Sequence, residues 1–87
     1  MSRMRFNSLN EFQDYLEKQG DKTMEFRAIP ISGEPEEFYY DGHKKVVTRN
    51  EDGKMFDNVE DFLCYTFQCD EEGYTHTEHV DVELKIQ

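Results

Sequence analysis

The sequence lacks any long apolar run. Hydrophobic residues make up 36% of its 87 positions, and they never gather into the roughly 18 consecutive residues of a membrane-spanning helix. Arg3 and Arg5 are not followed by an apolar segment, which argues against a secretory signal peptide. Two cysteines are too few for a disulfide framework. We therefore expect a protein of the reducing cytoplasm.

Basic residues are also scarce. The chain has 10 lysines and arginines against 20 aspartates and glutamates, which gives a net charge of −10. Its basic clusters, Arg3 with Arg5 and Lys44 with Lys45, are small. DNA, RNA and anionic membranes would repel such a molecule, so direct binding to any of them is not expected. The charge favours a basic partner, or it serves only to keep a small protein in solution.

Motifs for catalysis or metal binding are missing as well. There is no glycine-rich phosphate loop, and the turn at residues 50–53 lacks the further ligands of a calcium loop. Cys64, Cys69, His76 and His79 form a poor zinc pattern, because the two histidines would point to opposite faces of a strand. Nothing in the sequence places either thiol beside an imidazole. We predict no enzyme activity, no cofactor and no bound metal.

Aromatic residues, by contrast, are plentiful. Seven phenylalanines and five tyrosines make up 14% of the chain. A disordered acidic segment would have few of them, so we expect a folded core. The length suits one small domain over residues 1–87, with residues 1–6 as a loose N-terminal segment. No repeat, low-complexity stretch or linker divides it.

Two stretches have the period of amphipathic helices. The first follows Asn7 or Ser8 as N-cap, has Glu11 in the capping-box position and ends at Gly20. The second is expected to begin after an Asp57 cap. Acidic residues occupy the polar sides of both. The apolar faces are Leu9, Phe12 and Leu16 in the first helix, and Val59, Phe62, Leu63, Thr66 and Phe67 in the second.

Strands are indicated by alternation and by turn signals. Residues 23–31 and 74–87 alternate apolar and polar side chains, which is the period of a half-buried strand. The Asp-Gly pair at 41–42 predicts a two-residue hairpin turn in which Tyr40 opposes His43. A later Asp-Gly pair leads into a short third strand or an extended return.

The predicted elements follow the order α-β-β-β-α-β. A mixed or antiparallel sheet with both helices packed on one face would bury every apolar stripe. We therefore predict a small single domain of the α+β class.

Carboxylates are dense enough on this small domain to suggest a function. Duplex DNA carries about one negative charge per 1.7 Å of its axis, and a rigid acidic surface can imitate that array. A protein built to grip DNA would then accept it. For any single acid, a solvated surface without a partner is the simpler interpretation. The candidate binding acids are Glu34, Glu36, Glu37, Asp41, Glu60, Asp61, Asp70, Glu71, Glu72, Glu78, Asp81 and Glu83.

The chain also resembles a known class of proteins. In size, acidity, aromatic content and the runs EPEEFYYD, NVEDF and CDEE, it is similar to the small early proteins of bacteriophages that block host nucleic-acid machinery. Several of these mimic DNA, and others inhibit restriction or CRISPR systems, a uracil-DNA glycosylase or the histone-like nucleoid protein. The resemblance implies a non-enzymatic inhibitor in the host cytoplasm. Its partner would be a basic host protein, such as a DNA-binding or nucleoid protein or a nucleic-acid enzyme.

Exposed tyrosines would anchor such a contact, because tyrosine is enriched at binding hot spots. Tyr39 and Tyr65 are the candidates. The alternative function is a small cytoplasmic adaptor or regulatory module that recognises a protein partner through an aromatic patch or a sheet edge. A homodimer formed through the long last strand is left open.

Overall fold

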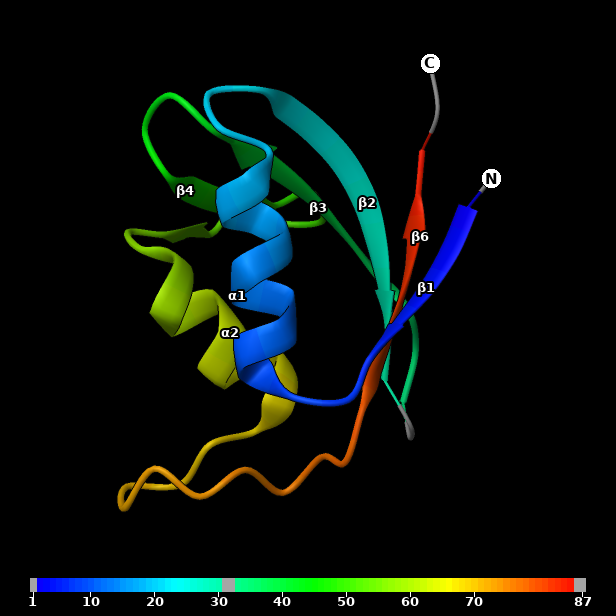
Figure 1. Ribbon diagram of the computed structural model, residues 1–87, viewed down its shortest axis with the longest axis vertical. Coiled ribbons are helices and arrows are strands. Elements are labelled where there is room, and N and C mark those ends of the chain that lie inside the picture. Colours follow the sequence, from blue (N-terminus) through cyan, green and yellow to red (C-terminus); the bar gives the residue numbers. More distant parts are fainter. Residues whose placement is uncertain (1, 31–32, 86–87) are drawn as a thin grey trace.

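The computed structural model describes residues 2–30 and 33–85, so the predicted strand ends at Ile31 and at Ile86 and Gln87 lie outside it. A six-stranded antiparallel sheet carries both helices on one face (Figure 1), which confirms the predicted α+β class. The strand order is β1-β6-β2-β3-β4-β5. The elements are β1 (Ser2–Phe6), α1 (Leu9–Lys18), β2 (Thr23–Ile29), β3 (Glu36–Asp41), β4 (Val46–Arg49), β5 (Met55–Phe56), α2 (Val59–Phe67) and β6 (Val80–Leu84).

Residues 2–6 form a strand, where a loose segment was predicted. β1 pairs antiparallel with β6, so Phe6 opposes Val80 and Arg5 opposes Asp81. Phe6 is buried and stacks on Phe12 of α1, with ring centroids 4.5 Å apart. Two apolar residues alternating with two arginines are too short a pattern to predict a strand, and this one depends on a partner far away in the sequence.

The first helix is capped as predicted. The Ser8 hydroxyl accepts a hydrogen bond from the backbone N–H of Glu11 at 3.2 Å, and the Glu11 carboxylate accepts one from the N–H of Asn7 at 2.7 Å. The first bond satisfies one of the donors that a helix start leaves free, and the second ties the residue before the cap to the first turn. Phe12 and Leu16 of its apolar face are fully buried.

The second helix begins one residue later than predicted. Asn58, and not Asp57, is the N-cap: its side-chain oxygen accepts a hydrogen bond from the N–H of Asp61 at 2.8 Å. β5 ends at Phe56, and Asn58 after the predicted cap still has an extended backbone, with φ of −147° and ψ of 163°. The predicted apolar face is confirmed, since its three largest side chains are buried: Phe62, Leu63 and Phe67.

The hairpin between β3 and β4 has a four-residue loop in place of the predicted two-residue turn. Tyr40 opposes Val47 instead of His43. The Asp41 carboxylate accepts hydrogen bonds from two backbone N–H groups of the loop. The shift in register is even, so Tyr40 and Val47 remain on the buried face.

The last strand is shorter than its sequence pattern. β6 covers Val80–Leu84, while residues 70–79 form a loop that runs beneath the helices (Figure 1). Thr77 is buried in this loop and donates its backbone N–H to the carbonyl of Phe67 at 3.3 Å. β6 lies between β1 and β2, so neither of its edges is free for a dimer.

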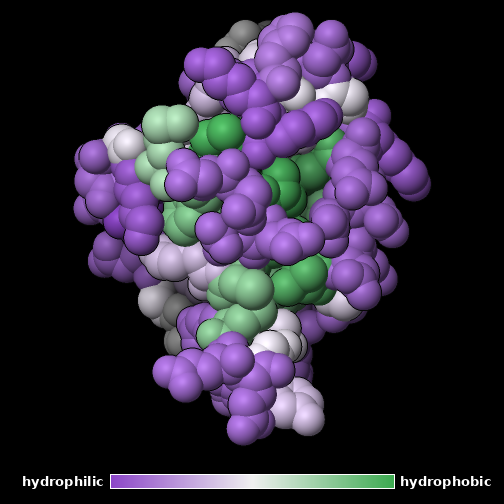
Figure 2. Space-filling model, turned by 90° about the vertical axis from the view of Figure 1, so that its left-hand side faces the viewer, coloured by the Kyte–Doolittle hydropathy of each residue, from purple (hydrophilic) through white to green (hydrophobic). Residues whose placement is uncertain are grey.

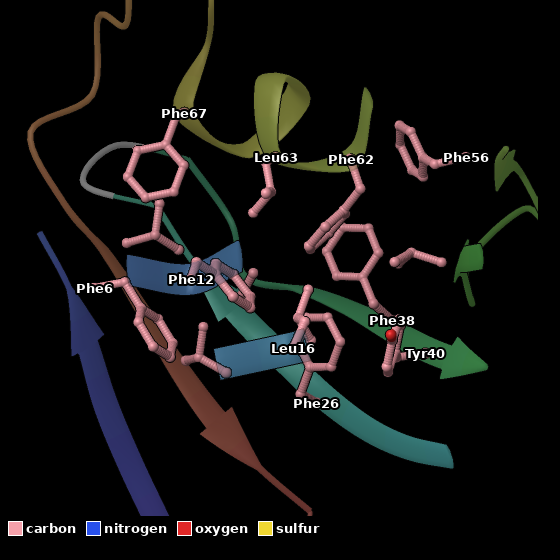
Figure 3. Close-up of a cluster of buried hydrophobic side chains, with 14 residues drawn as sticks. Phe6, Phe12, Leu16, Phe26, Phe38, Tyr40, Phe56, Phe62, Leu63 and Phe67 are labelled. Atoms are coloured by element: carbon pink, nitrogen blue, oxygen red, sulfur yellow. The ribbon is translucent and has the colours of Figure 1, made fainter. Parts of the chain in front are cut away.

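The core lies between the helices and the sheet, and Phe62 is at its centre (Figure 3). Its ring lies within 5.0–5.9 Å of four other phenylalanine rings, mostly edge to face. Aromatic pairs of this geometry add to the free energy gained by burial alone. The four rings come from α1, β2, β3 and β5, and they are those of Phe12, Phe26, Phe38 and Phe56.

A candidate interaction surface

Negative charge is concentrated on one side of the molecule. We call residues 7–18 and 57–79 the helical side, because they comprise the two helices and the segments around them. This side contains ten acids and one lysine, so it holds −9 of the net charge of −10, and the rest of the chain is almost neutral. Its acids are Glu11, Asp14, Glu17, Asp57, Glu60, Asp61, Asp70, Glu71, Glu72 and Glu78.

The acids of the helical side are all exposed. Within residues 2–30 and 33–85, none of them lies within ion-pair distance of a lysine or arginine. Asp70 alone has an ion-pair partner, His76, at 3.3 Å. In Figure 2, hydrophilic side chains cover most of this face, and apolar atoms are visible in its middle.

The opposite side of the sheet, which we call the open face, alternates acids and bases across its strands. Arg3 opposes Glu83, and Arg27 opposes both Glu83 and Glu37. Arg27 Nη2 lies 3.4 Å from Glu37 Oε1, and Lys85 forms a further ion pair with the same carboxylate. Lys85, followed by Arg27, holds the pKa of Glu37 below its ordinary value. The charges on this face therefore largely cancel.

Asp81 was predicted to be part of an exposed acidic surface, but the structure buries it on the open face. Arg5 Nε donates to Oδ1 at 2.8 Å, and Arg3 Nη2 donates to Oδ2 at 2.8 Å. The side chain of Asp81 is only 9% exposed. Hydrogen bonds from Arg5 and Arg3 hold the pKa of Asp81 far below its ordinary range. The aspartate thus fastens β1 to β6 and is not available to a partner.

The twelve candidate acids divide evenly between the two sides. Six lie on the helical side: Glu60, Asp61, Asp70, Glu71, Glu72 and Glu78. The other six lie on the sheet or its connecting loops: Glu34, Glu36, Glu37, Asp41, Asp81 and Glu83. The structure therefore does not bring all twelve into one surface.

Four acids of the helical side were not among the candidates. The helical period had placed Glu11, Asp14 and Glu17 on the polar face of the first helix, and Asp57 was read only as a cap. The sequence predicted both helices on one face of the sheet, but the polar faces of the two helices were not combined into one acidic surface. The signal that could have found these residues is the near-absence of basic residues in both helices.

Asp70 has a structural role in the loop that follows α2. Its Oδ1 accepts hydrogen bonds from the backbone N–H groups of Tyr74 at 2.9 Å and of Glu72 at 3.0 Å. These bonds lower the pKa of Asp70, and the bond from Tyr74 has the larger effect. The loop therefore presents Glu71 and Glu72 at the tip of a turn that Asp70 holds closed.

The two candidate tyrosines lie on different sides. Tyr39 is half-buried on the open face, between Glu25 and Thr48 of the neighbouring strands. Tyr65 projects from α2 and is 38% exposed. They cannot contact one partner surface together.

The hydroxyl group of Tyr65 already has two partners. It donates to Glu36 at 2.7 Å and accepts from Arg49 Nη1 at 2.8 Å. Burial and the bond to Glu36 raise the pKa of Tyr65. Asp52 completes the cluster through Arg49, whose Nη2 lies 2.6 Å from it. The cluster joins α2 to β3 and β4, so the ring edge of Tyr65, and not its hydroxyl, is what remains for a partner.

Grooves lie at both ends of the helix pair. One, of about 590 Å³, runs between the start of α1 and residues 75–78. The other, of about 350 Å³, lies between α1 and the start of α2, with Leu16 and Val59 among its lining residues. Both acids and bases line this second groove: Glu17, Asp57, Glu60, Lys44 and Lys45.

The described part of the chain contains no group of three or more His, Cys, Asp or Glu side chains that could hold a metal ion. Cys64 and Cys69 are both free thiols. None of the helices is long and apolar enough to span a bilayer. Comparisons with protein-family models, with curated proteins and with solved structures found no match.

Proposed function

We propose that this protein is a non-enzymatic, phage-type inhibitor of the cytoplasm that imitates DNA with its helical side. It would bind a basic host protein that handles nucleic acid and cover the DNA-binding site of that protein. The observation that carries the proposal is the division of charge: −9 of the net −10 lies on one side, in exposed acids, and among the described residues none of these acids lies within ion-pair distance of a lysine or arginine. The three acids of α1 and Asp57 join the footprint, and the six candidate acids of the sheet side leave it.

A one-sided charge has a direct physical consequence. The field of ten exposed carboxylates steers a basic partner towards the helical side, while the nearly neutral open face attracts little over a distance. A DNA-binding protein that accepted this surface would release the anions held by its own basic groove, as it does on binding DNA. The affinity would therefore fall steeply with salt.

The test is a binding panel of purified bacterial DNA-binding proteins, including a nucleoid protein and a uracil-DNA glycosylase. Binding is measured by calorimetry at low and at high salt, in competition with duplex DNA. The expected result is a partner whose affinity falls with salt and which DNA displaces. A panel with no such partner, or affinity that does not change with salt, would contradict the proposal.

A matched pair of variants locates the footprint. Glu71→Lys with Glu72→Lys reverses two charges on the helical side, and Glu34→Lys with Glu51→Lys makes the same change in charge among exposed residues outside it. The first should reduce affinity at least about tenfold and lower the salt dependence. The second should change both much less. Equal losses would mean that only the net charge matters.

The adaptor function is the second candidate, and the free edge of β1 favours it. Among the described strands, β1 pairs only with β6, so its other edge can accept an added strand from a partner. Such binding uses backbone hydrogen bonds and would tolerate salt. A proline at Met4 that removes binding, with charge reversals on the helical side having no effect, would favour the adaptor over the DNA mimic.

A further inference from the structure

The two cysteines occupy the two key positions of a helix ending. Cys64 is in the last turn of α2, and Gln68 after the helix adopts a left-handed backbone conformation with φ of 55°. The backbone N–H of Cys69 then donates to the carbonyl of Cys64 at 2.9 Å. A bond across five residues over a left-handed residue defines the Schellman motif.

This motif brings the two side chains together. In a Schellman ending, the residues joined by that bond commonly contact each other through their side chains. The bond from Cys69 to Cys64 over the left-handed Gln68 places the two side chains next to each other in this way. Burial, and then the neighbouring Cys64 thiol, raise the pKa of Cys69 to about 11. Cys64 is exposed and Cys69 is half-buried. A reagent in solution therefore reaches the Cys64 thiol more easily than the Cys69 thiol.

We propose that Cys64 and Cys69 form an internal thiol–disulfide exchange site whose substrates are small, positively charged disulfides. The Cys64 thiolate attacks one sulfur of the small disulfide and displaces the first small thiol, leaving a mixed disulfide on Cys64. The sulfur of Cys69 then attacks Cys64 Sγ, the Cys64–Cys69 disulfide forms, and the second small thiol leaves. The protein thiols lose two protons and two electrons, and the small disulfide takes them up as two thiols.

The charge of the substrate follows from the surroundings of Cys64. Glu60 and Asp61 lie one helical turn before it, on the same exposed side of α2. The helical side as a whole attracts cations and repels anions. A cationic disulfide such as cystamine should therefore reach Cys64 faster than the anionic glutathione disulfide. This inference does not depend on the proposed function, since a protein without any partner would react in the same way.

The test is reaction of the full chain with cystamine, followed by mass spectrometry without reductant. The wild type should lose two hydrogen atoms and keep no adduct. Cys69→Ser should keep a cystamine-derived adduct on Cys64, because the second sulfur is missing. Cys64→Ser should react much more slowly, since Cys69 is half-buried. A wild type that accumulates the adduct, or that forms intermolecular dimers, would overturn the exchange site.

Reaction rates test the charge of the substrate. At low salt, cystamine should react with the wild type at least about tenfold faster than glutathione disulfide, after correction for their rates with free cysteine. The ratio should shrink as salt is added, because salt screens the acids. Glu60→Gln with Asp61→Asn should shrink it too. Equal corrected rates at low salt would overturn the preference for cationic disulfides.

Discussion

The helical side and the open face use similar residues in opposite ways. On the open face, acids lie opposite arginines on neighbouring strands, and two ion pairs hold β1 to β6. On the helical side, ten acids lie near one another with almost no base among them. The first arrangement is explained by folding. The second is not, because unpaired like charges repel each other and weaken the folded state. Such a surface is therefore the better candidate for a function.

The largest expected effect comes from the residue that joins the two sides. Phe62→Ala removes the ring that contacts four others between helices and sheet, and it should lower the free energy of unfolding by about 3–5 kcal/mol. In a domain of this size, that could abolish folding. Urea unfolding followed by circular dichroism measures it. Met55→Ala, at an exposed site, is the control and should cost under about 0.5 kcal/mol.

On the open face, Asp81→Asn should cost about 2 kcal/mol, because it removes the charge that Arg3 and Arg5 share. The pKa of Asp81 is lowered in the folded state, so its contribution is complete above the unfolded pKa near about 4 and is lost as the pH falls below it. Unfolding curves of both proteins at several pH values measure this. If the difference in unfolding free energy between the two proteins stayed constant down to strongly acidic pH, the ion pair would be contradicted.

Within the helical side, a smaller effect tests the cap of α2. Asn58→Ala should lower the free energy of unfolding by about 1 kcal/mol, since it removes the hydrogen bond to the N–H of Asp61. Asp57→Ala should cost less than about 0.5 kcal/mol. Thermal unfolding of the two variants compares them. A larger loss from Asp57→Ala than from Asn58→Ala would identify Asp57 as the cap, as the sequence pattern predicted.

The smallest expected effect is the change in unfolding free energy when one carboxylate is neutralised, and it should have opposite signs on the two sides. Glu17→Gln should stabilise the protein by about 0.3–0.5 kcal/mol, because Glu17 lies in the last turns of α1 and one turn after Asp14. Glu37→Gln should destabilise it, because Glu37 has two basic partners. Both differences, measured by urea unfolding, should shrink in high salt. If both variants lost a similar amount of unfolding free energy, the two sides would not differ in this way.

The fold could be predicted from the sequence wherever a local pattern is sufficient. The period of Phe12 and Leu16 and the alternation of Val80 and Val82 predicted elements that the structure contains. The failures depend on distant partners. β1 requires β6, which lies more than seventy residues later, and the β3–β4 register is set where Gly42 packs so closely on Lys22 that a Cβ would lie 2.2 Å from its carbonyl oxygen.

Only part of the candidate surface could be predicted from the sequence. Glu71 and Glu72 could be predicted to be exposed, because they lie beside a glycine in a polar turn. The burial of Asp81 could not, because an alternating strand places it on the polar face, and only the position of Arg3 and Arg5 on the adjacent strand explains it. Both helices were predicted on one face of the sheet, but no local pattern shows that their polar faces and residues 70–79 form one acidic side.

The position of β6 also determines when the protein can finish folding during synthesis. Every other strand and both helices leave the ribosome before β6, yet β6 is the strand that fills the space between β1 and β2. Until it arrives, both strands have unpaired backbone groups on facing edges, which invite pairing with other chains. The acidic helices are already made at that stage, and their mutual repulsion between nascent chains would keep these incomplete sheets apart.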